Sequence, residues 1–278
     1  MGLFDSLSSS VAGMQAQTFA LQNISGNIAN SQTPAYKTTD TSFQDLLNSQ
    51  GSADQSSGGV QARSKNNNTL QGAIQTAKTS TYMAVQGDGY FTVQKPSAVA
   101  SGGQPSISNS SPVYTRRGDF QTDSNGYLVN GAGYYLMGNP VDPSTGNATG
   151  GAPQALQVNA ANLPTNEGKL ESLSIDSKGQ LQGTFSSGKT VSLAEIPLST
   201  FNGQNFLKPG DGGTYTPTTA SGAAKAGATG QIVGSSLEAS NTDISNQFTS
   251  MIMAQQAYGA NTKTMASTNQ MLQTLTRL

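Results

Sequence analysis

One stretch of the chain fits a phosphate-binding pattern. Residues 183–190 read GTFSSGKT, which matches the P-loop form G-x-x-x-x-G-K-[ST]. In a P-loop, the loop amides and the N-terminus of a following helix hold the phosphates together. Pro197 follows Thr190 by seven residues and would cut such a helix short. We therefore expect residues 186–189 to form a hairpin turn and not a nucleotide site.

The other patterns that could do chemistry are also incomplete. If Gly126 is the sixth position of a calcium loop, the first and twelfth positions are Gln121 and Ala132. Neither residue supplies the carboxylate that such a loop requires, so a plain turn is expected there. Arg116 and Arg117 are expected to be a solvated pair on a strand edge and not an anion site.

Composition excludes further classes of function. The 278 residues include no histidine and no cysteine, which removes the commonest general base, the commonest metal ligand and any thiol nucleophile. Only 10% of the residues are charged and the net charge is −1, which argues against nucleic-acid binding. No apolar run approaches the roughly 18–20 residues of a membrane helix. We expect no enzyme activity, no cofactor, no metal ion and no membrane insertion.

Both ends of the chain carry apolar residues at alternating spacings of three and four, which predicts helices. Polar residues such as Thr18 and Gln255 interrupt both stripes. A lone pair of such helices buries little apolar area, so we expect both to be disordered in the monomer and to fold on assembly. Ser240 or Asn241 is the expected N-cap of the second helix. The expected self-assembly residues are Leu7, Val11, Met14, Leu21, Ile24, Ile28, Ile244, Phe248, Met251, Tyr258, Met265 and Leu272.

The middle of the chain predicts β-structure. Short apolar runs alternate with turn sequences rich in glycine, asparagine and serine, and residues 86–89 (QGDG) predict a tight turn between two strands. We expect an α+β protein with three parts. Residues 1–30 pair with 241–278 as coiled-coil helices, residues 81–207 form an antiparallel β-domain, and residues 31–80 and 208–240 are extended linkers.

Three separate motifs resemble bacterial flagellar rod and hook proteins. Residues 21–30 (LQNISGNIAN), followed by 33–37 (TPAYK), resemble the N-terminal signature of that family. Residues 237–244 (LEASNTDI) and the helix after them resemble its C-terminal helix. Residues 85–91 (VQGDGYF) and 114–120 (YTRRGDF) resemble its core β-domain. The resemblance covers nearly the whole chain in order.

The resemblance implies a structural subunit of a hollow helical polymer. Its partners would be further copies of itself, the neighbouring rod, hook–filament junction and hook cap proteins, and the type III export apparatus. Its location would be the flagellar hook or basal body, outside the cell and without a cleaved signal peptide. The first basic residue is Lys37, so the start of the chain does not have the charged beginning of a secretory signal.

Within this family, two members remain open. Residues 173–201 resemble the hook protein, which transmits torque through a flexible tube. Hook proteins usually carry an inserted outer domain, and this chain has almost no room for one outside the turn-rich residues 138–166. The short length therefore favours a distal rod protein, which remains the alternative. Ala35 and Gln256 depart from the family pattern, and Gly259 is expected to weaken the C-terminal helix by about 1 kcal/mol. Outside the family, an oligomeric β-domain that binds a ligand is the competing class.

Overall fold

The structure is a computed structural model that describes residues 3–48, 56–96, 98–99, 105–106, 111–141, 153–158, 169–227 and 229–277. The chain divides into two compact units. The helical unit contains Met1–Gln32, Lys37–Asn67 and Thr242–Leu278. The β-unit contains Thr33–Tyr36 and Asn68–Asn241. Two helices and an antiparallel sheet confirm the α+β prediction. Most of the stretch 138–166 lies outside the described residues.

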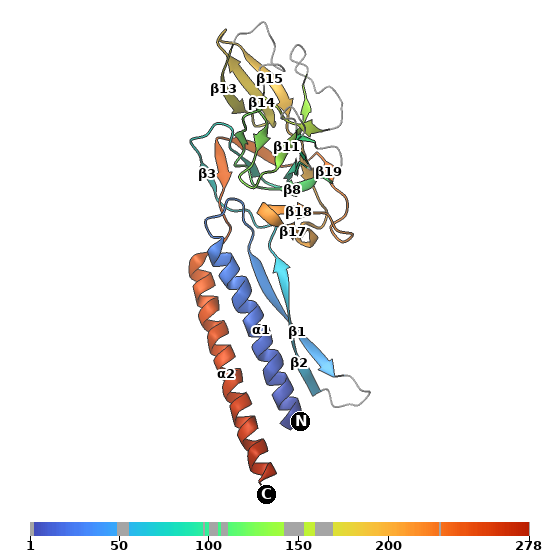
Figure 1. Ribbon diagram of the computed structural model, residues 1–278, viewed down its shortest axis with the longest axis vertical. Helices are drawn as coiled ribbons and strands as arrows, with labels where there is room; N and C mark the ends of the chain where they lie inside the picture. The colour runs from blue at the N-terminus through green and yellow to red at the C-terminus, as the bar shows by residue number, and fades with distance from the viewer. Residues whose placement is uncertain are drawn as a thin grey trace. The chain divides into compact units, whose positions relative to one another are not determined.

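The helical unit holds two long helices and one β-hairpin. Helix α1 (Leu3–Ala29) and helix α2 (Ile244–Thr276) lie side by side, and the two chain termini mark the same end of the pair (Figure 1). The pair is therefore antiparallel. Strands β1 (Thr39–Asn48) and β2 (Ser56–Asn66) form an antiparallel hairpin that contacts α1.

The N-cap of helix α2 lies two or three residues beyond the position expected from the sequence. The N-cap is Asp243, whose carboxylate accepts hydrogen bonds from the amides of Ser245 and Asn246 at 2.9 and 3.2 Å. The prediction of Ser240 or Asn241 was wrong, because the Asn241 side chain donates to the carbonyl of Leu70 instead. A carboxylate at this position also faces the positive end of the helix dipole.

The prediction that residues 31–80 form a linker was wrong for the hairpin. Strands β1 and β2 pair from Thr39–Asn66 to Asn48–Ser56, with a register shift between Asp45 and Leu47. The hairpin sequence is polar and rich in serine and glycine, so it gives little of the alternation by which strands are recognised. Backbone hydrogen bonds and contact with α1 hold it in place.

Most strands of the β-unit belong to one antiparallel sheet, which has thirteen strands in the part of the chain that the structure describes. Its main path runs β13 (Leu170–Ile175), β14 (Gln180–Phe185), β15 (Thr190–Glu195), β11 (Tyr135–Pro140), β5 (Tyr90–Gln94), β8 (Val113–Thr115), β18 (Thr214–Thr216) and β17 (Lys208–Gly210). Beside this path lie β9 (Gln121–Thr122), β10 (Leu128–Val129), β12 (Gln154–Ala155), β16 (Leu198–Thr200) and β19 (Lys225–Ala226). Two short 3-10 helices, η1 (Gln204–Phe206) and η2 (Asp211–Gly213), connect the later strands.

Three two-stranded ladders accompany this sheet in the described β-unit. Strand β20 (Gln231–Gly234) pairs with β4 (Met83–Gln86), and β21 (Ser236–Glu238) pairs with β3 (Ile74–Thr76). The third ladder joins β6 (Ala98–Val99) to β7 (Pro105–Ser106). Residues 208–240 were predicted to be a linker, but they supply β17 to β21. That prediction failed because these strands are short and because β18, β20 and β21 pair with strands more than 90 residues away.

Two apolar clusters form the core of the β-unit. The larger one contains Met83, Val85, Phe91, Val93, Phe120, Leu128, Leu136, Leu156, Leu181, Ala194, Ile196, Leu198 and Ile232. In the smaller one, Tyr90 packs edge-to-face on Phe201 and Tyr215, with ring centroids 5.8 and 5.7 Å apart. Ile232 shows that the C-terminal strand β20 contributes to the main core.

The P-loop pattern is a hairpin turn, as predicted. Strands β14 and β15 pair on either side of it, and the amide of Gly188 donates to the carbonyl of Phe185 at 2.8 Å. The turn at residues 86–89 also forms, with φ of +90° at Gly87 and +154° at Gly89. The flanking strands do not pair with each other, because β4 pairs with β20 while β5 joins the large sheet.

Gly118→Ala tests the close approach of two core segments. The Gly118 carbonyl accepts a hydrogen bond from the Met83 amide at 3.0 Å, and a Cβ at position 118 would overlap the Met83 carbonyl oxygen. We expect the variant to lose about 3 kcal/mol of unfolding free energy in urea denaturation, as for an overpacked core. Gly133→Ala is the control, because its methyl group meets open space and adds only φ strain. Equal losses in the two variants would contradict the steric account.

Candidate functional site

The fully buried side chains of the helix pair are mostly small or polar. The buried residues of α1 are Ser10, Ala16, Ala20, Ile24 and Asn27, and those of α2 are Ala254 and Thr268. The helices also approach closely at Gly13, where a Cβ would lie 2.7 Å from the Asn261 side-chain nitrogen. Small residues let two helices come close, but they bury little apolar surface.

Asn27 connects the three parts of the helical unit. Its side chain is almost fully buried, and its Nδ2 donates to the Thr39 carbonyl at 3.0 Å and to Gln247 Oε1 at 3.2 Å. Its Oδ1 accepts from the Thr39 amide at 3.0 Å. Asn27 thus joins α1 to strand β1 and to α2, and every polar atom of its amide group has a partner.

The predicted self-assembly residues do not meet in one buried seam within a single copy. On α1, Ile24 is buried, while Leu7, Val11, Met14, Leu21 and Ile28 are half-buried. On α2, Met251, Met265 and Leu272 are half-buried. Ile244, Phe248 and Tyr258 are exposed, with 45%, 51% and 39% of their surface accessible. The face of α2 that contacts its own chain carries Gln247, Ala254, Asn261 and Thr268 instead, which recur every seven residues.

Three large apolar side chains of α2 form an exposed face. Ile244, Phe248 and Ile252 follow one another at spacings of four, which places them along one side of the helix. Further exposed apolar residues of the two helices are Phe4, Met253, Met271 and Leu275. We call the set Ile244, Phe248 and Ile252 the apolar face of α2. Isolated apolar residues on a surface are ordinary, but an ordered stripe of this kind is typical of an interaction surface.

A groove lies between α1, β1 and α2. It has a volume of about 460 Å³ and is lined by Gln17, Ala20, Asn23, Ile24, Asn27, Thr39, Asp40, Thr41, Phe43, Gln247, Ser250, Met253 and Ala254. Its floor contains the buried Ala20, Ile24 and Ala254, and exposed Phe43 and Met253 stand among its lining residues. Gln247, Ser250, Met253 and Ala254 line the groove from α2, and the helical period places them on the other side of the helix from the apolar face.

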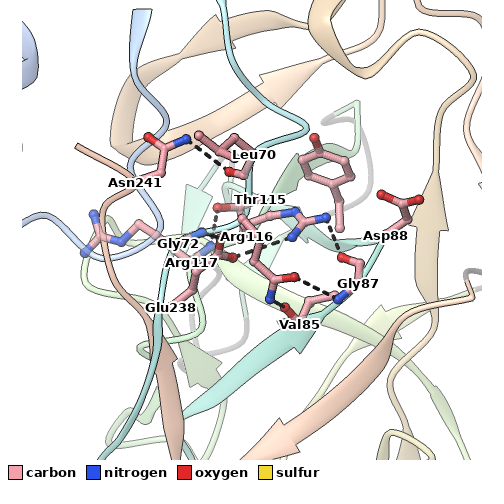
Figure 2. Close-up of polar contacts among 12 residues, drawn as sticks. Leu70, Gly72, Val85, Gly87, Asp88, Thr115, Arg116, Arg117, Glu238 and Asn241 are labelled. Atoms are coloured by element: carbon pink, nitrogen blue, oxygen red, sulfur yellow. Dashed lines mark hydrogen bonds and ion pairs between the residues drawn. The ribbon is translucent and has the colours of Figure 1, made fainter. Parts of the chain in front are cut away.

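The β-unit contains a second constellation, the ion pair of Arg116 and Glu238, which are 2% and 1% exposed. Arg116 Nη1 lies 3.6 Å from Glu238 Oε2, and Arg116 Nη2 donates to the Gly87 carbonyl at 2.7 Å (Figure 2). The guanidinium also lies over the Tyr90 ring, 5.1 Å from its centroid. The prediction of a solvated Arg116 was wrong, because the carboxylate that pairs with it lies more than 120 residues further along the chain.

Glu238 is bound on several sides. Its Oε1 accepts from the Gly72 amide at 2.8 Å, and its backbone carbonyl accepts from the Ala35 amide at 2.8 Å. Arg117, the neighbour of Arg116, pairs with Asp119 through two hydrogen bonds of 2.6 and 3.0 Å. Both arginines are thus paired with carboxylates of the same chain.

Two segments of the chain match families of known proteins. Residues 84–183 match the family described as flagellar hook protein FlgE/F/G D1 domain. Residues 233–278 match the family described as flagellar basal body rod FlgEFG protein C-terminal. The two matched segments include Arg116 and Glu238, and the second also includes the apolar face of α2. The chain belongs to the flagellar rod and hook axial protein family.

Two kinds of relative are similar to this axial protein. The flagellar hook protein FlgE of Brucella abortus biovar 1 (strain 9-941) is 37% identical over 164 residues, which cover 59% of the chain and 38% of the hook protein. The flagellar basal-body rod protein FlgG of Bacillus subtilis (strain 168) is 28% identical over 292 residues, which cover 98% of both chains. FlgG of Caulobacter vibrioides is 29% identical over the same share. The match thus spans less than two fifths of the length of the hook protein.

No helix among the described residues of the axial protein combines the length and the apolar character that a membrane crossing requires. Asp123 forms the plain turn that was predicted, since its Oδ1 accepts from the amides of Asn125 and Tyr127 at 2.9 and 2.7 Å.

Sequence reasoning missed the role of Glu238 in this axial protein. The available signal was a single glutamate in residues 226–242, a stretch that has no other charged residue. A lone charge beside an apolar residue such as Leu237 is a candidate for burial with a partner. The identity of that partner could not be read from the sequence, because no spacing rule relates residues so far apart.

Alkaline pH is expected to weaken the β-unit of the axial protein through Tyr90. Burial raises the pKa of Tyr90 to about 12, and the Arg116 guanidinium opposes part of that rise. An unfolded tyrosine has a pKa of about 10. The folded state therefore keeps the proton longer, and the contribution of Tyr90 is fully present below pH ~10 and is lost as the pH rises through about 12.

Tyr90→Phe provides the measurement. The urea midpoint is measured at pH 8, 10 and 11.5, and it is expected to fall less steeply with rising pH for the variant than for the parent chain. Tyr90→Phe also loses the 3.3 Å hydrogen bond to Gln204, but this loss is the same at every pH. Burial also raises the pKa of Tyr215, so some decline will remain in the variant. Identical slopes for the two proteins would contradict the assignment to Tyr90.

Proposed function

We propose that this axial protein is a structural subunit of the flagellar hook and polymerises through its terminal helices into a hollow, flexible helical tube. One observation carries the proposal: the helix pair buries small and polar residues against its own chain and leaves the apolar face of α2 exposed. A helix normally buries its largest apolar residues, so this face is expected to find its partner in another copy.

The charge distribution of the helices supports self-association. In the helical segments, α1 carries only Asp5 and α2 only Lys263 as charged residues. In a homopolymer each side chain meets the same neighbours in every copy, so a charge-poor surface avoids repeated like-charge contacts. Contacts between two different surfaces of identical subunits, repeated without closure, generate a filament.

The groove of the helical unit is the proposed receiving surface. The apolar face of α2 from one copy would dock at the groove of the next, where Phe43 and Met253 present apolar surface. In this arrangement the helices form a coiled-coil layer between copies. The expected self-assembly residues that are half-buried in one chain, such as Leu21 and Met251, would become fully buried in that layer.

A distal rod subunit is the second candidate. The rod relatives FlgG cover 98% of the chain and of their own length, whereas the hook relative has the higher identity over a shorter stretch. Electron microscopy of a deletion strain separates the two functions. Cells that complete a rod and lack a hook support the hook function, and cells that stop at an unfinished rod support the alternative.

The wider partners and the location are part of the same proposal. The neighbouring rod, hook–filament junction and hook cap proteins would contact the ends of the tube, and the type III export apparatus would deliver the chain without a cleaved signal peptide. The protein would be located in the flagellum, outside the cell body. A closed oligomer that binds a carbohydrate or a peptide would instead favour an oligomeric β-domain binding module.

Phe248→Asp tests the assembly surface. The side chain is half exposed in one copy, so a charge there should leave the β-unit folded and prevent the burial of the face in a polymer. We expect no filaments by negative-stain electron microscopy and an unchanged thermal transition of the β-unit. Thr249→Asp is the matched control, because it adds the same charge in the same turn at an exposed polar position. Normal filaments from Phe248→Asp would contradict the proposal.

A further inference from the structure

The chain passes between the helical unit and the β-unit at four places, after residues 32, 36, 67 and 241. On the side of the β-unit, these connections begin or end in residues 33–36, 68–72 and 238–241. These short segments come from distant parts of the sequence. Their contacts with the rest of the β-unit therefore determine how firmly the chain is fastened where it leaves that unit.

All three segments are bound to one another close to Glu238. The Ala35 amide donates to the Glu238 carbonyl at 2.8 Å, and the Asn241 amide donates to the Tyr36 carbonyl at 3.2 Å. Asn241 Nδ2 donates to the Leu70 carbonyl at 3.0 Å, and the Gly72 amide donates to Glu238 Oε1 at 2.8 Å (Figure 2). Glu238 and Asn241 thus join the three segments by four hydrogen bonds.

The ion pair joins this group of segments to the core. Arg116 lies immediately after β8 in the large sheet, and it is itself fixed by the Gly87 carbonyl and the Tyr90 ring. The Arg116 and Glu238 side chains are 3% and 0% exposed, so water does not weaken their attraction as it does at a surface. Removing one partner of such a pair leaves a buried charge without compensation.

The fit around Glu238 leaves little room for the backbone to move. A Cβ at Gly72 would overlap the carbonyl oxygen of Ala239 and would lie 3.4 Å from the Glu238 side chain. The Ala239 amide donates to the Ala73 carbonyl at 2.8 Å, which continues the ladder of β21 and β3. The segment that enters α2 is therefore packed directly on the segment that follows the hairpin.

We propose that Arg116 and Glu238 are a positioning pair that fastens every connection between the two units to the core of the β-unit. Loss of the pair releases residues 33–36, 68–72 and 238–241 together, while the distant strands β13, β14 and β15 keep their structure. The mechanical consequence rests on the proposed function: in a polymer that carries torque, load that passes along the chain between the units enters the β-unit at this pair.

Hydrogen exchange of the dilute chain, read by mass spectrometry, tests the fastening without any polymer. Glu238→Gln keeps the size of the side chain and an oxygen for the Gly72 amide but removes the charge. We expect exchange in the three connecting segments to accelerate about ten-fold or more, with β13 to β15 unchanged. Glu171→Gln is the matched control, since this glutamate is exposed on β13. Unchanged exchange at the segments, or equal acceleration throughout the β-unit, would overturn the proposal.

A second variant separates the pair from general damage to the fold. Arg116→Met should release the same three segments. The double variant with Glu238→Gln should exchange within about two-fold of the more open single variant, because the partners act as one unit. Additive acceleration in the double variant would show that the two residues act independently and would overturn the proposal.

Filament stiffness tests the mechanical consequence. Filaments of Glu238→Gln are expected to have a shorter persistence length in electron micrographs than filaments of the parent chain or of Glu171→Gln. Equal persistence lengths would overturn the assignment of load to the pair. If the parent chain forms no filament, the proposed function fails, and the exchange measurements still decide whether the pair fastens the connections.

Discussion

The helical unit of a single chain buries little of its large apolar side-chain surface. The buried side chains of helices α1 and α2 are mostly alanine, serine, threonine and asparagine, and Asn27 donates a hydrogen bond to Gln247 between the two helices. The larger apolar residues Ile244, Phe248 and Ile252 remain in water. The hydrophobic effect favours their burial by about 25 cal/mol for each Å² removed from water, so the proposed contact with another copy would stabilise the helical unit. The groove beside α2 provides a surface of suitable size and character for that contact.

The β-unit, in contrast, has a complete apolar core. Segments from both ends of its sequence contribute to that core. Strand β20 adds Ile232 to the main cluster, and Glu238 brings a negative charge to the buried Arg116. The pair contributes less to net stability than its Coulomb energy suggests, since both groups lose their hydration. The pair instead favours one arrangement of the chain, because only a fold that places residue 238 beside residue 116 compensates both buried charges. A protein with few charged residues thus uses two of them where its connections leave the β-unit.

Local patterns predicted the helices, an antiparallel β-domain in the middle of the chain and the turn at residues 186–189, because apolar spacing and turn residues act over a few positions. The hairpin β1–β2 escaped prediction because its polar sequence has no apolar period and its register comes from backbone bonds. The buried positions of α2 could not be recognised from the sequence, because the helix buries small residues such as Ala254 while large residues such as Phe248 stay exposed. The burial of Arg116 was missed for a third reason: its partner is remote in sequence.

The most direct measurement is the accessibility of the apolar face of α2 before and after assembly. The chain has no cysteine, so Ile252→Cys introduces a single reactive thiol on a side chain that is 55% exposed in one copy. The account predicts rapid maleimide labelling of the dilute chain and strong protection in the polymer, because a neighbouring copy covers position 252. Equal labelling rates in the dilute chain and in the polymer would show that the face stays in water, and would contradict the account.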